Sequence, residues 1–463
     1  MAEAKFLTGN LFRHVTVMSL TASLGLMAVF IVDFVDMIFI AMLGKSELAA
    51  AVGYAGAILF FTTSFGIGLA IAAGALVARA LGAGDEQLAR ERTTHALSYG
   101  FVFSALFAIS VWLSLDVLVR LLGATGETAV LAVHFLQIIV PSMPFLIIGM
   151  MGGAVLRAHG DARRAMMSTI AGGLVNAALD PILIFGLNLE LTGAAIASVA
   201  ARLVICVMAL WPLMKIYGGI TRPRLSGMLR DLSPILAIAF PSILAQIATP
   251  VGQAFVTRAM AGYGEGAVAG LAVVGRLTPV AFGVVFALSG AVGPIIGQNF
   301  GAGNIERVKR GFNAAVIFVA VVIVLVSGVL FLVRGPIADL FGAQGVTREL
   351  IFLFCGPLSL AFFFPGILFI SNAAFNNLGH PFYSTFVNWG RNVVALIPLV
   401  FMGSWAFGAQ GVLIGQTLAG VVFGAIAWVL ALRVIETCAD APPPKRDLFG
   451  REGRLMALWN LRR

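Results

Sequence analysis

Long hydrophobic stretches alternate with short polar segments along almost the whole chain. A helix needs about 20 apolar residues to cross the hydrocarbon core of a bilayer, and twelve stretches reach that length. They cover residues 15–43, 50–79, 94–119, 128–156, 165–187, 191–214, 233–261, 267–299, 311–333, 348–375, 382–403 and 408–432. The pattern predicts an all-α polytopic membrane protein with 12 transmembrane helices.

The composition agrees with this class. Of the 463 residues, 60% are hydrophobic and 11% are charged, and the mean hydropathy is +1.00. The first hydrophobic stretch is too long for the core of a signal peptide, so we expect it to remain as a span. The three cysteines lie far apart, which favours simple packing over a disulfide framework or a metal cluster.

The net charge of +9 reflects membrane topology rather than nucleic-acid binding. Of the 30 Lys and Arg residues, 22 fall in the two ends of the chain and in alternate loops. Basic residues concentrate in cytoplasmic loops, so we expect a protein of the cytoplasmic (inner) membrane with both termini in the cytoplasm.

The chain contains an internal repeat. "GALVARALGAGD" (74–85) recurs as "GPIIGQNFGAGN" (293–304), and "RAHGDA" (157–162) corresponds to "NNLGHP" (376–381) at the same offset of 219. Two halves of six spans each are typical of transporters with a site between their repeats. The predicted parts are an N-lobe at 1–214, a cytoplasmic linker at 215–232, a C-lobe at 233–433 and a basic cytoplasmic tail at 434–463.

Two features of the chain leave alternatives open. The tail is both basic and apolar, which fits either an amphipathic segment on the inner leaflet or a disordered tail. The arginines within spans are candidates for counter-charges or for local structural pairs; the main ones are Arg202, Arg276 and Arg391.

Motifs for chemistry are absent from the sequence. "MLGKS" (42–46) lacks the first glycine of a phosphate loop, the five histidines show no metal-binding spacing, and no nucleophile motif occurs. We therefore expect no enzyme activity and no cofactor other than a coupling ion.

Carboxylates within spans are the strongest functional signal, because an Asp at the centre of a membrane helix costs on the order of 2.5–3.5 kcal/mol. The acids inside the predicted spans are Asp33, Asp36, Asp116 and Asp180. Asp116 is close enough to a span end to reach the headgroups.

Asp36 and Asp180 are the main candidates for a cation-coupling site. Asn176 precedes Asp180 by four residues, so both lie on one helical face, and Ser198 is a further oxygen donor. Such oxygens can hold a proton or coordinate a hard cation. If the ion is Na+, we expect Asp36, Asn176 and Asp180 to be its ligands, and Asp33 is a possible additional member.

In the order and spacing of its motifs, the chain resembles the multidrug and toxic compound extrusion (MATE) family. The resemblance rests on "VDMIFIAMLGKSELAA" (35–50), on the repeated glycine motif, on "RAHGDARRAMMSTIAGGLVNAALDPILIFG" (157–186) and on "LTGAAIAS" (191–198). It implies two six-helix bundles related by pseudo-two-fold symmetry in a V, with coupling residues at Asp36, Asn176 and Asp180. Ser198 stands where a threonine is common.

The resemblance also indicates a branch. Acids expected in the seventh and tenth helices of NorM-like members are missing, which favours the DinF-like branch. Members often carry a proline early in helix 1, whereas the first proline here is Pro141. We therefore do not expect helix 1 to bend in the usual way.

The predicted function is an antiporter that exports amphipathic, often cationic or aromatic compounds by alternating access, driven by inward H+ or Na+. The expected partners are drug-like small molecules and membrane lipid, with no nucleic acid, and the expected state is a monomer. The alternative is a flippase of lipid-linked precursors or polysaccharides from the same superfamily.

Overall fold

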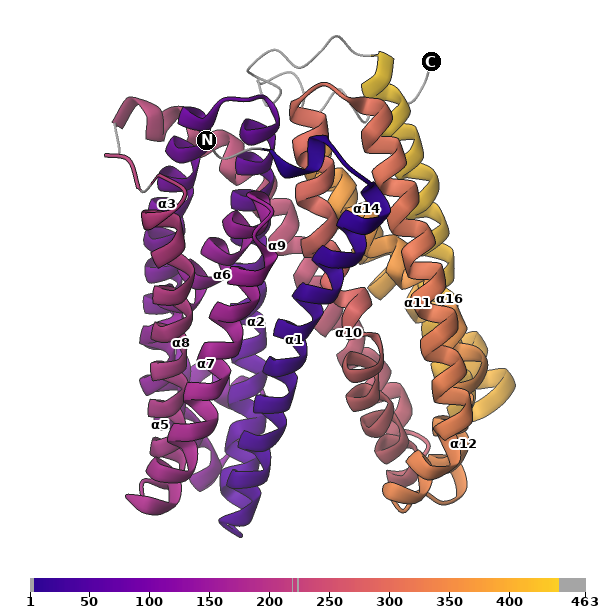
Figure 1. The fold of residues 1–463 in the computed structure, drawn as a ribbon. Helices are drawn as coiled ribbons and strands as arrows, with labels where there is room; N and C mark the ends of the chain where they lie inside the picture. Colours follow the sequence, from indigo (N-terminus) through magenta and orange to yellow (C-terminus); the bar gives the residue numbers. More distant parts are fainter. Residues whose placement is uncertain (1–3, 219, 223–224, 441–463) are drawn as a thin grey trace. The chain divides into compact units, whose positions relative to one another are not determined.

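The computed structural model describes residues 4–218, 220–222 and 225–440. All regular structure in these residues is helical, with no strand (Figure 1). The predicted all-α class is confirmed. Most of the predicted tail, 434–463, lies outside the described residues. The prediction of either an amphipathic segment or a disordered tail therefore also lies outside them.

Contacts divide the chain into two compact units. Unit 1 contains the described residues from 24 to 239, and unit 2 contains residues 5–23 together with the described residues from 240 on. Two helices therefore pass from one unit into the other, α1 (Leu11–Met42) and α9 (Leu225–Ala261). The division differs from the predicted lobes mainly at the start of the chain, because residues 5–23 pack with the second half.

The remaining helices of unit 1 follow one another with short connections. They are α2 (Ser46–Gly82), α3 (Glu86–Leu113), α4 (Leu115–Leu121), α5 (Gly126–Ile139), the short turn η2 (Val140–Ser142), α6 (Met143–Ala158), α7 (Ala162–Pro181), the π-helical turn η3 (Ile182–Gly186) and α8 (Glu190–Lys215). The extensive packing of α7 on α8 and of α2 on α6 forms the core of this unit.

Unit 2 begins with the short 3₁₀ turn η1 (Lys5–Leu7) and the first half of α1. Its other elements are α10 (Glu265–Gly301), α11 (Ile305–Leu340), α12 (Gly345–Leu353), the π-helical turn η4 (Phe354–Leu358), α13 (Ser359–Ala361), α14 (Phe363–Leu378), α15 (Pro381–Trp389), the π-helical turn η5 (Gly390–Ala395) and α16 (Leu396–Asp440). α14 packs on both α10 and α16.

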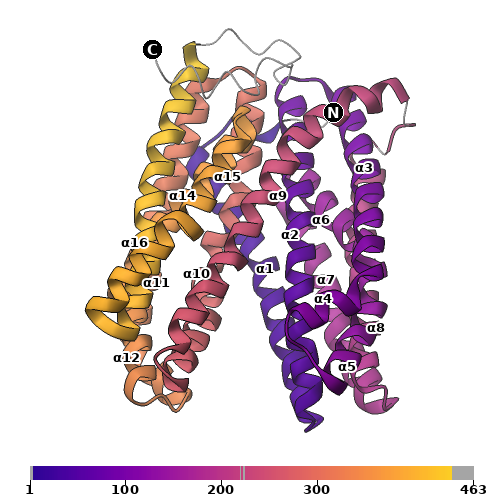
Figure 2. The ribbon, with the colours of Figure 1, turned by 180° about the vertical axis from the view of Figure 1, so that it is seen from behind.

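The helices account for the predicted spans. Among the described residues, ten helices are long and apolar enough to cross a membrane. The bent pair Gly345–Ala361 and Phe363–Leu378, with an angle of 45° between its parts, meets the same criteria when its two parts are taken together. The last of the ten, Pro381–Ala439, covers two predicted spans. Its chain reverses near Gly408, where φ is 58° and ψ is −136°, and a Cβ on Gly411 would lie 1.8 Å from the carbonyl oxygen of Gly403. The resulting hairpin is visible in Figure 2.

The repeated glycine motif is a helix-turn-helix signal. Gly84 and Gly303 adopt left-handed φ values of 71° and 72°, which glycine reaches without steric cost. The next residue in each copy, Asp85 or Asn304, accepts a hydrogen bond from the backbone N–H three residues later. Each motif therefore ends one helix and caps the next, α2 to α3 in unit 1 and α10 to α11 in unit 2.

Candidate functional site

Three of the predicted site residues lie together in unit 1. Asn176 of α7 donates from Nδ2 to both carboxylate oxygens of Asp36 on α1, at 2.9 Å each. The same nitrogen donates to Oδ2 of Asp180 at 2.8 Å. The spacing of four residues puts Asn176 and Asp180 on one face of α7, and this face meets the second half of α1. We call these three residues the carboxylate–amide cluster.

The cluster is buried most deeply on α7. Asp180 is 0% exposed and Asn176 is 4% exposed, whereas Asp36 is half-buried. The Oδ1 atom of Asp180 is buried and has no hydrogen-bond partner among the described residues. A buried carboxylate oxygen that accepts no hydrogen bond is costly. This atom is therefore the natural place to bind a proton or a cation.

The electrostatics of the cluster favour a bound positive charge. Because one nitrogen contacts Asp36 and Asp180, oxygens of the two carboxylates lie within about two hydrogen-bond lengths of each other. Two negative charges at such a short distance repel each other strongly where little water is present to screen them. A neutral amide can donate two hydrogens but carries no charge, so a proton or a monovalent cation would offset the repulsion.

The end of α7 is adapted to the cluster. Pro181 follows Asp180 directly and has no N–H, so it cannot donate to the carbonyl of Ala177. The chain then widens into the π-helical turn η3, a feature common at functional sites. Phe185 of η3 contacts Phe39 of α1 edge to face, with 6.0 Å between ring centroids. This contact and the cluster together hold α7 against α1.

Two predicted members are not brought into the cluster. Ser198 is half-buried on α8, and no hydrogen bond joins it to Asp36, Asn176 or Asp180 within the described part of the chain. Asp33 is exposed on α1 and is likewise not hydrogen-bonded to them. The roles expected for both residues remain predictions.

The arginine of α8 has a local partner. Arg202 donates from Nη1 to the carbonyl of Ile139 and to Oγ of Ser142, at 3.1 Å each. It thereby fastens α8 to the irregular turn between α5 and α6. This geometry favours the structural interpretation of Arg202 over that of a counter-charge for the carboxylates. Arg276 and Arg391 belong to α10 and η5 of unit 2.

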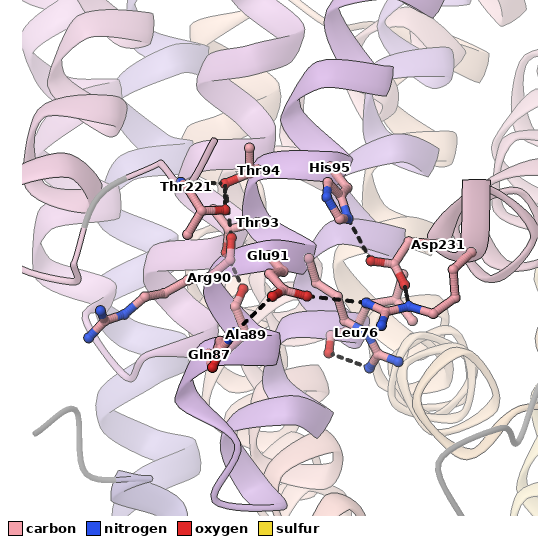
Figure 3. A network of polar contacts seen from close by, with 12 residues as sticks. Leu76, Gln87, Ala89, Arg90, Glu91, Thr93, Thr94, His95, Thr221 and Asp231 are labelled. Carbon is pink, nitrogen blue, oxygen red and sulfur yellow. Dashed lines mark hydrogen bonds and ion pairs between the residues drawn. The ribbon is translucent and has the colours of Figure 1, made fainter. Parts of the chain in front are cut away.

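A second polar cluster in unit 1 was not predicted (Figure 3). His95 of α3 and Asp231 of α9 are buried and lie 2.7 Å apart, Nδ1 to Oδ2. Arg230 contacts Asp231 at 3.2 Å and Glu91 at 3.3 Å. Close by, the hydroxyl of Thr94 accepts from the backbone N–H of residue 221 at 2.9 Å. These bonds fasten the start of α9 to α3.

No group of three or more His, Cys, Asp or Glu side chains suited to a metal ion occurs among the residues that the structure describes. The carboxylate–amide cluster has only two carboxylates, a donor set better matched to a proton or to Na+ than to a transition metal.

Both halves of the chain match one known family. The family model described as MatE matches residues 21–182 and again residues 241–402. The chain belongs to the MatE family. The two matches confirm the internal duplication, and all three members of the carboxylate–amide cluster lie in the first.

Relatives of this MatE chain are membrane transporters. It is 29% identical over 426 residues to a FAD transporter of Shewanella oneidensis, covering 90% of this chain and 94% of the relative. It is 26% identical over 434 residues to the multidrug export protein MepA of Staphylococcus aureus, covering 91% and 95%. A crystal structure of a variant of the Vibrio cholerae MATE transporter VcmN has the same fold, with a TM-score of 0.88 at 24% identity over 92% of this chain and 97% of that chain.

The two MatE copies differ at the position of the cluster. The offset of 219 places Phe255, Ala395 and Leu399 where the first copy has Asp36, Asn176 and Asp180. In unit 2, α9 contacts α16 through Phe255 and Phe401, whose ring centroids are 5.9 Å apart. It also accepts hydrogen bonds from α15, from Thr385 to the carbonyl of Pro241 and from Trp389 to the carbonyl of Leu244. The second copy therefore has no acid at these three positions, and its corresponding helices are joined by other contacts.

Proposed function

We propose that this MatE chain is a secondary active exporter that couples inward movement of H+ or Na+ to efflux of amphipathic compounds. The observation that carries the proposal is the amide of Asn176 shared by the carboxylates of Asp36 and Asp180. Acids within membrane spans are costly, and they usually mark the path of an ion. Proton entry supplies about 2.3 kcal/mol per charge per 100 mV, which is enough to drive export.

The chemistry assigned to the cluster is reversible ion binding. With a proton on Asp180, the cluster carries one negative charge and its two acids no longer repel each other. Release of the proton leaves two carboxylates held only by Asn176, so the contact between α1 and α7 weakens. Na+ would act in the same way, with oxygens of Asp36 and Asp180 as ligands and the oxygen of Asn176 as a third ligand once its amide has turned to face them. In either case the bound ion strengthens the contact between α1 and α7, and release of the ion weakens that contact.

The orientation belongs to the same proposal. The distribution of basic residues supports a multi-pass protein of the cytoplasmic membrane with both termini in the cytoplasm. The ion then enters the cluster from outside and leaves toward the cytoplasm. We propose that the chain works as a monomer in contact with membrane lipid.

The substrate class has two candidates. Aromatic or cationic drugs are supported by the relationship to a multidrug export protein. Flavin dinucleotides are supported by the FAD transporter, which is matched over 90% of this chain. Cationic aromatic drugs and flavin dinucleotides are both amphipathic, but the drugs are positively charged and the dinucleotides are negatively charged. The flippase alternative would require a lipid-linked substrate instead.

Purified protein in liposomes tests the proposal. Efflux of ethidium and of FAD is measured under a pH gradient alone and under a Na+ gradient alone, for the wild type and for Asp36→Asn and Asp180→Asn. The proposal predicts that one gradient drives efflux of at least one probe and that both variants abolish the driven part. Undiminished gradient-driven efflux in both variants would refute the assignment of the cluster.

A further inference from the structure

The start of the chain is docked into unit 2 by its backbone. The turn η1 presents Phe6, whose side chain is 2% exposed. The backbone N–H of Phe6 donates to Oε1 of Gln298 at 2.9 Å, and its carbonyl accepts from Nδ2 of Asn299 at 3.1 Å. Both groups belong to the end of α10. We call residues 5–9 the N-terminal segment.

Arg307 of α11 completes this arrangement. Its Nη2 atom donates to the carbonyls of Phe6, Thr8 and Gly9, at 3.0, 3.2 and 3.3 Å. Its Nε atom donates to Oδ1 of Asn299 at 3.1 Å. A guanidinium can bind several acceptors in a fixed plane, which a lysine cannot do. We call Gln298, Asn299 and Arg307 the cradle.

The cradle is built into the helix ends that form it. Gln298 and Asn299 are both 0% exposed, and Asn299 also donates to the carbonyl of Ile295 at 2.8 Å. Removal of the N-terminal segment would leave two buried amides without these partners, which is costly. The contact continues along α1, where Phe12 meets Phe318 edge to face with 6.2 Å between ring centroids.

The repeat does not require a cradle. The offset of 219 places Arg79, Ala80 and Leu88 of the first copy at the positions of Gln298, Asn299 and Arg307. The shared helix-turn-helix therefore folds without this set of side chains in unit 1. Its presence in unit 2 is explained by the segment that it holds.

The docked segment leads directly to the ion site. α1 belongs to unit 2 as far as residue 23 and to unit 1 from residue 24, and Asp36 lies on its second half. We infer that the cradle is a permanent anchor for the start of α1 and that Arg307 is a positioning residue for coupled transport, since it makes α1 follow unit 2. This inference rests on the proposed function for its transport consequence, but the anchoring itself can be measured separately.

The anchor is tested with paired cysteines after Cys206, Cys355 and Cys438 are replaced by Ala. The test pair is Leu11→Cys with Gly311→Cys, because a Cβ on Gly311 would lie 3.9 Å from Cδ2 of Leu11. The control pair is Gly266→Cys with Thr347→Cys, also within unit 2, where the corresponding distance to Oγ1 of Thr347 is 3.5 Å.

A permanent anchor predicts that the test pair crosslinks to the same yield with and without substrate, at acidic and at neutral pH. It also predicts that the crosslinked protein transports as well as the reduced protein. A yield that changes with substrate or pH, or transport that is lost on oxidation of the test pair but not of the control pair, would overturn the inference.

Arg307 itself is tested against a neighbouring arginine. Arg310 lies on the same helix but is exposed and pairs with Glu306, so Arg310→Ala is the matched control. Arg307→Ala should lower coupled efflux roughly tenfold, the effect of losing a hydrogen-bonded charge, and Arg310→Ala should change it less than about twofold. Arg307→Lys should recover only part of the loss.

Rescue provides the decisive readout. In Arg307→Ala protein that also carries the test pair, oxidation replaces the lost anchor by a covalent bond and should restore efflux, and reduction should remove it again. Efflux that stays low after complete crosslinking would overturn the positioning role. If the wild type shows no gradient-driven efflux, the proposed function fails, while the crosslinking yield still decides whether the anchor is permanent.

Discussion

The side-chain amide of Asn176 contacts both carboxylate oxygens of Asp36 at 2.9 Å, although 140 residues separate the two positions. The same nitrogen holds Asp180 one helical turn away on α7. Asn176 is thus the residue that brings the two acids together, and its loss should affect transport as strongly as the loss of an acid.

Replacement of Asn176 by Ala should reduce gradient-driven efflux roughly tenfold or more, because two charge-assisted hydrogen bonds disappear and the acids are free to separate. The measurement is the initial rate of efflux from proteoliposomes. Asn388→Ala is the matched control, since Asn388 is also buried and its amide donates to the carbonyl of Ser384 within the same helix. Equal losses in the two variants would indicate a general effect of removing a buried amide.

Asp33 and Asp36 should behave differently, although they lie three residues apart. No hydrogen bond joins Asp33 to the cluster among the described residues, so Asp33→Asn leaves the hydrogen bonds of the cluster intact and should change efflux less than about threefold. Asp36→Asn removes a carboxylate bound by Asn176 and should abolish the driven component. A loss of the same size in Asp33→Asn would add Asp33 to the coupling site.

The turn before α7 should give a pH-dependent contribution to stability. Burial raises the pKa of Asp161, but hydrogen bonds from Arg164 and Tyr217 outweigh it and hold that pKa below its usual value. A lowered pKa in the folded state means stability that is present at neutral pH and is lost as the pH falls through the folded value. Tyr217 is the matching partner, with a pKa raised to about 12 by burial and by its bond to Asp161.

The Asp161→Asn variant isolates that charge, because Asn also caps helices well. It should lower the free energy of unfolding by about 1 kcal/mol at neutral pH, seen as a lower Tm in detergent. The difference from the wild type should shrink as the pH falls below about 4, where an ordinary Asp becomes protonated. A difference that is independent of pH would show that the charge of Asp161 does not contribute.

The buried pair of His95 and Asp231 depends on a glycine. A Cβ on Gly227 would lie 2.8 Å from Cε1 of His95, so Gly227→Ala should displace the imidazole from Asp231. Breaking a buried pair costs several kcal/mol, and we expect a clear fall in Tm. Gly275→Ala, in the middle of α10 with open space around its Cβ, is the control and should leave Tm unchanged or higher. Equal Tm values for the two variants would contradict the importance of the pair.

Hydropathy is sufficient to predict the helices, because the bilayer core requires apolar side chains and internally satisfied backbone groups. It does not reveal irregularities inside a span, such as the π-helical turn after Pro181 or the reversal at Gly408 that joins two spans without a polar loop. Those features depend on one proline or glycine in an otherwise apolar stretch.

The site was predicted as far as local geometry and the cost of burial allow. Asn176 and Asp180 share a face at a spacing of four, and Asp36 stands out because acids are rare in spans. Most contacts between residues far apart in the sequence have no such signal in the residue types or their spacing. Ser198 was expected at the site but is not hydrogen-bonded to it, and the docking of Phe6 into the cradle was not expected, because most of its bonds are made by backbone groups that every sequence contains.

The most direct test of the central claim is ion uptake driven by substrate. Proteoliposomes are loaded with a dye that reports H+ or Na+, without an ion gradient, and are mixed with the transported probe. The movement of H+ or Na+ is then recorded for the wild type, Asp180→Asn and Asn388→Ala. If the cluster binds the coupling ion, the ion moves opposite to substrate in the wild type and in Asn388→Ala, and no ion moves in Asp180→Asn. Ion movement of the wild-type size in Asp180→Asn would contradict this role of the cluster.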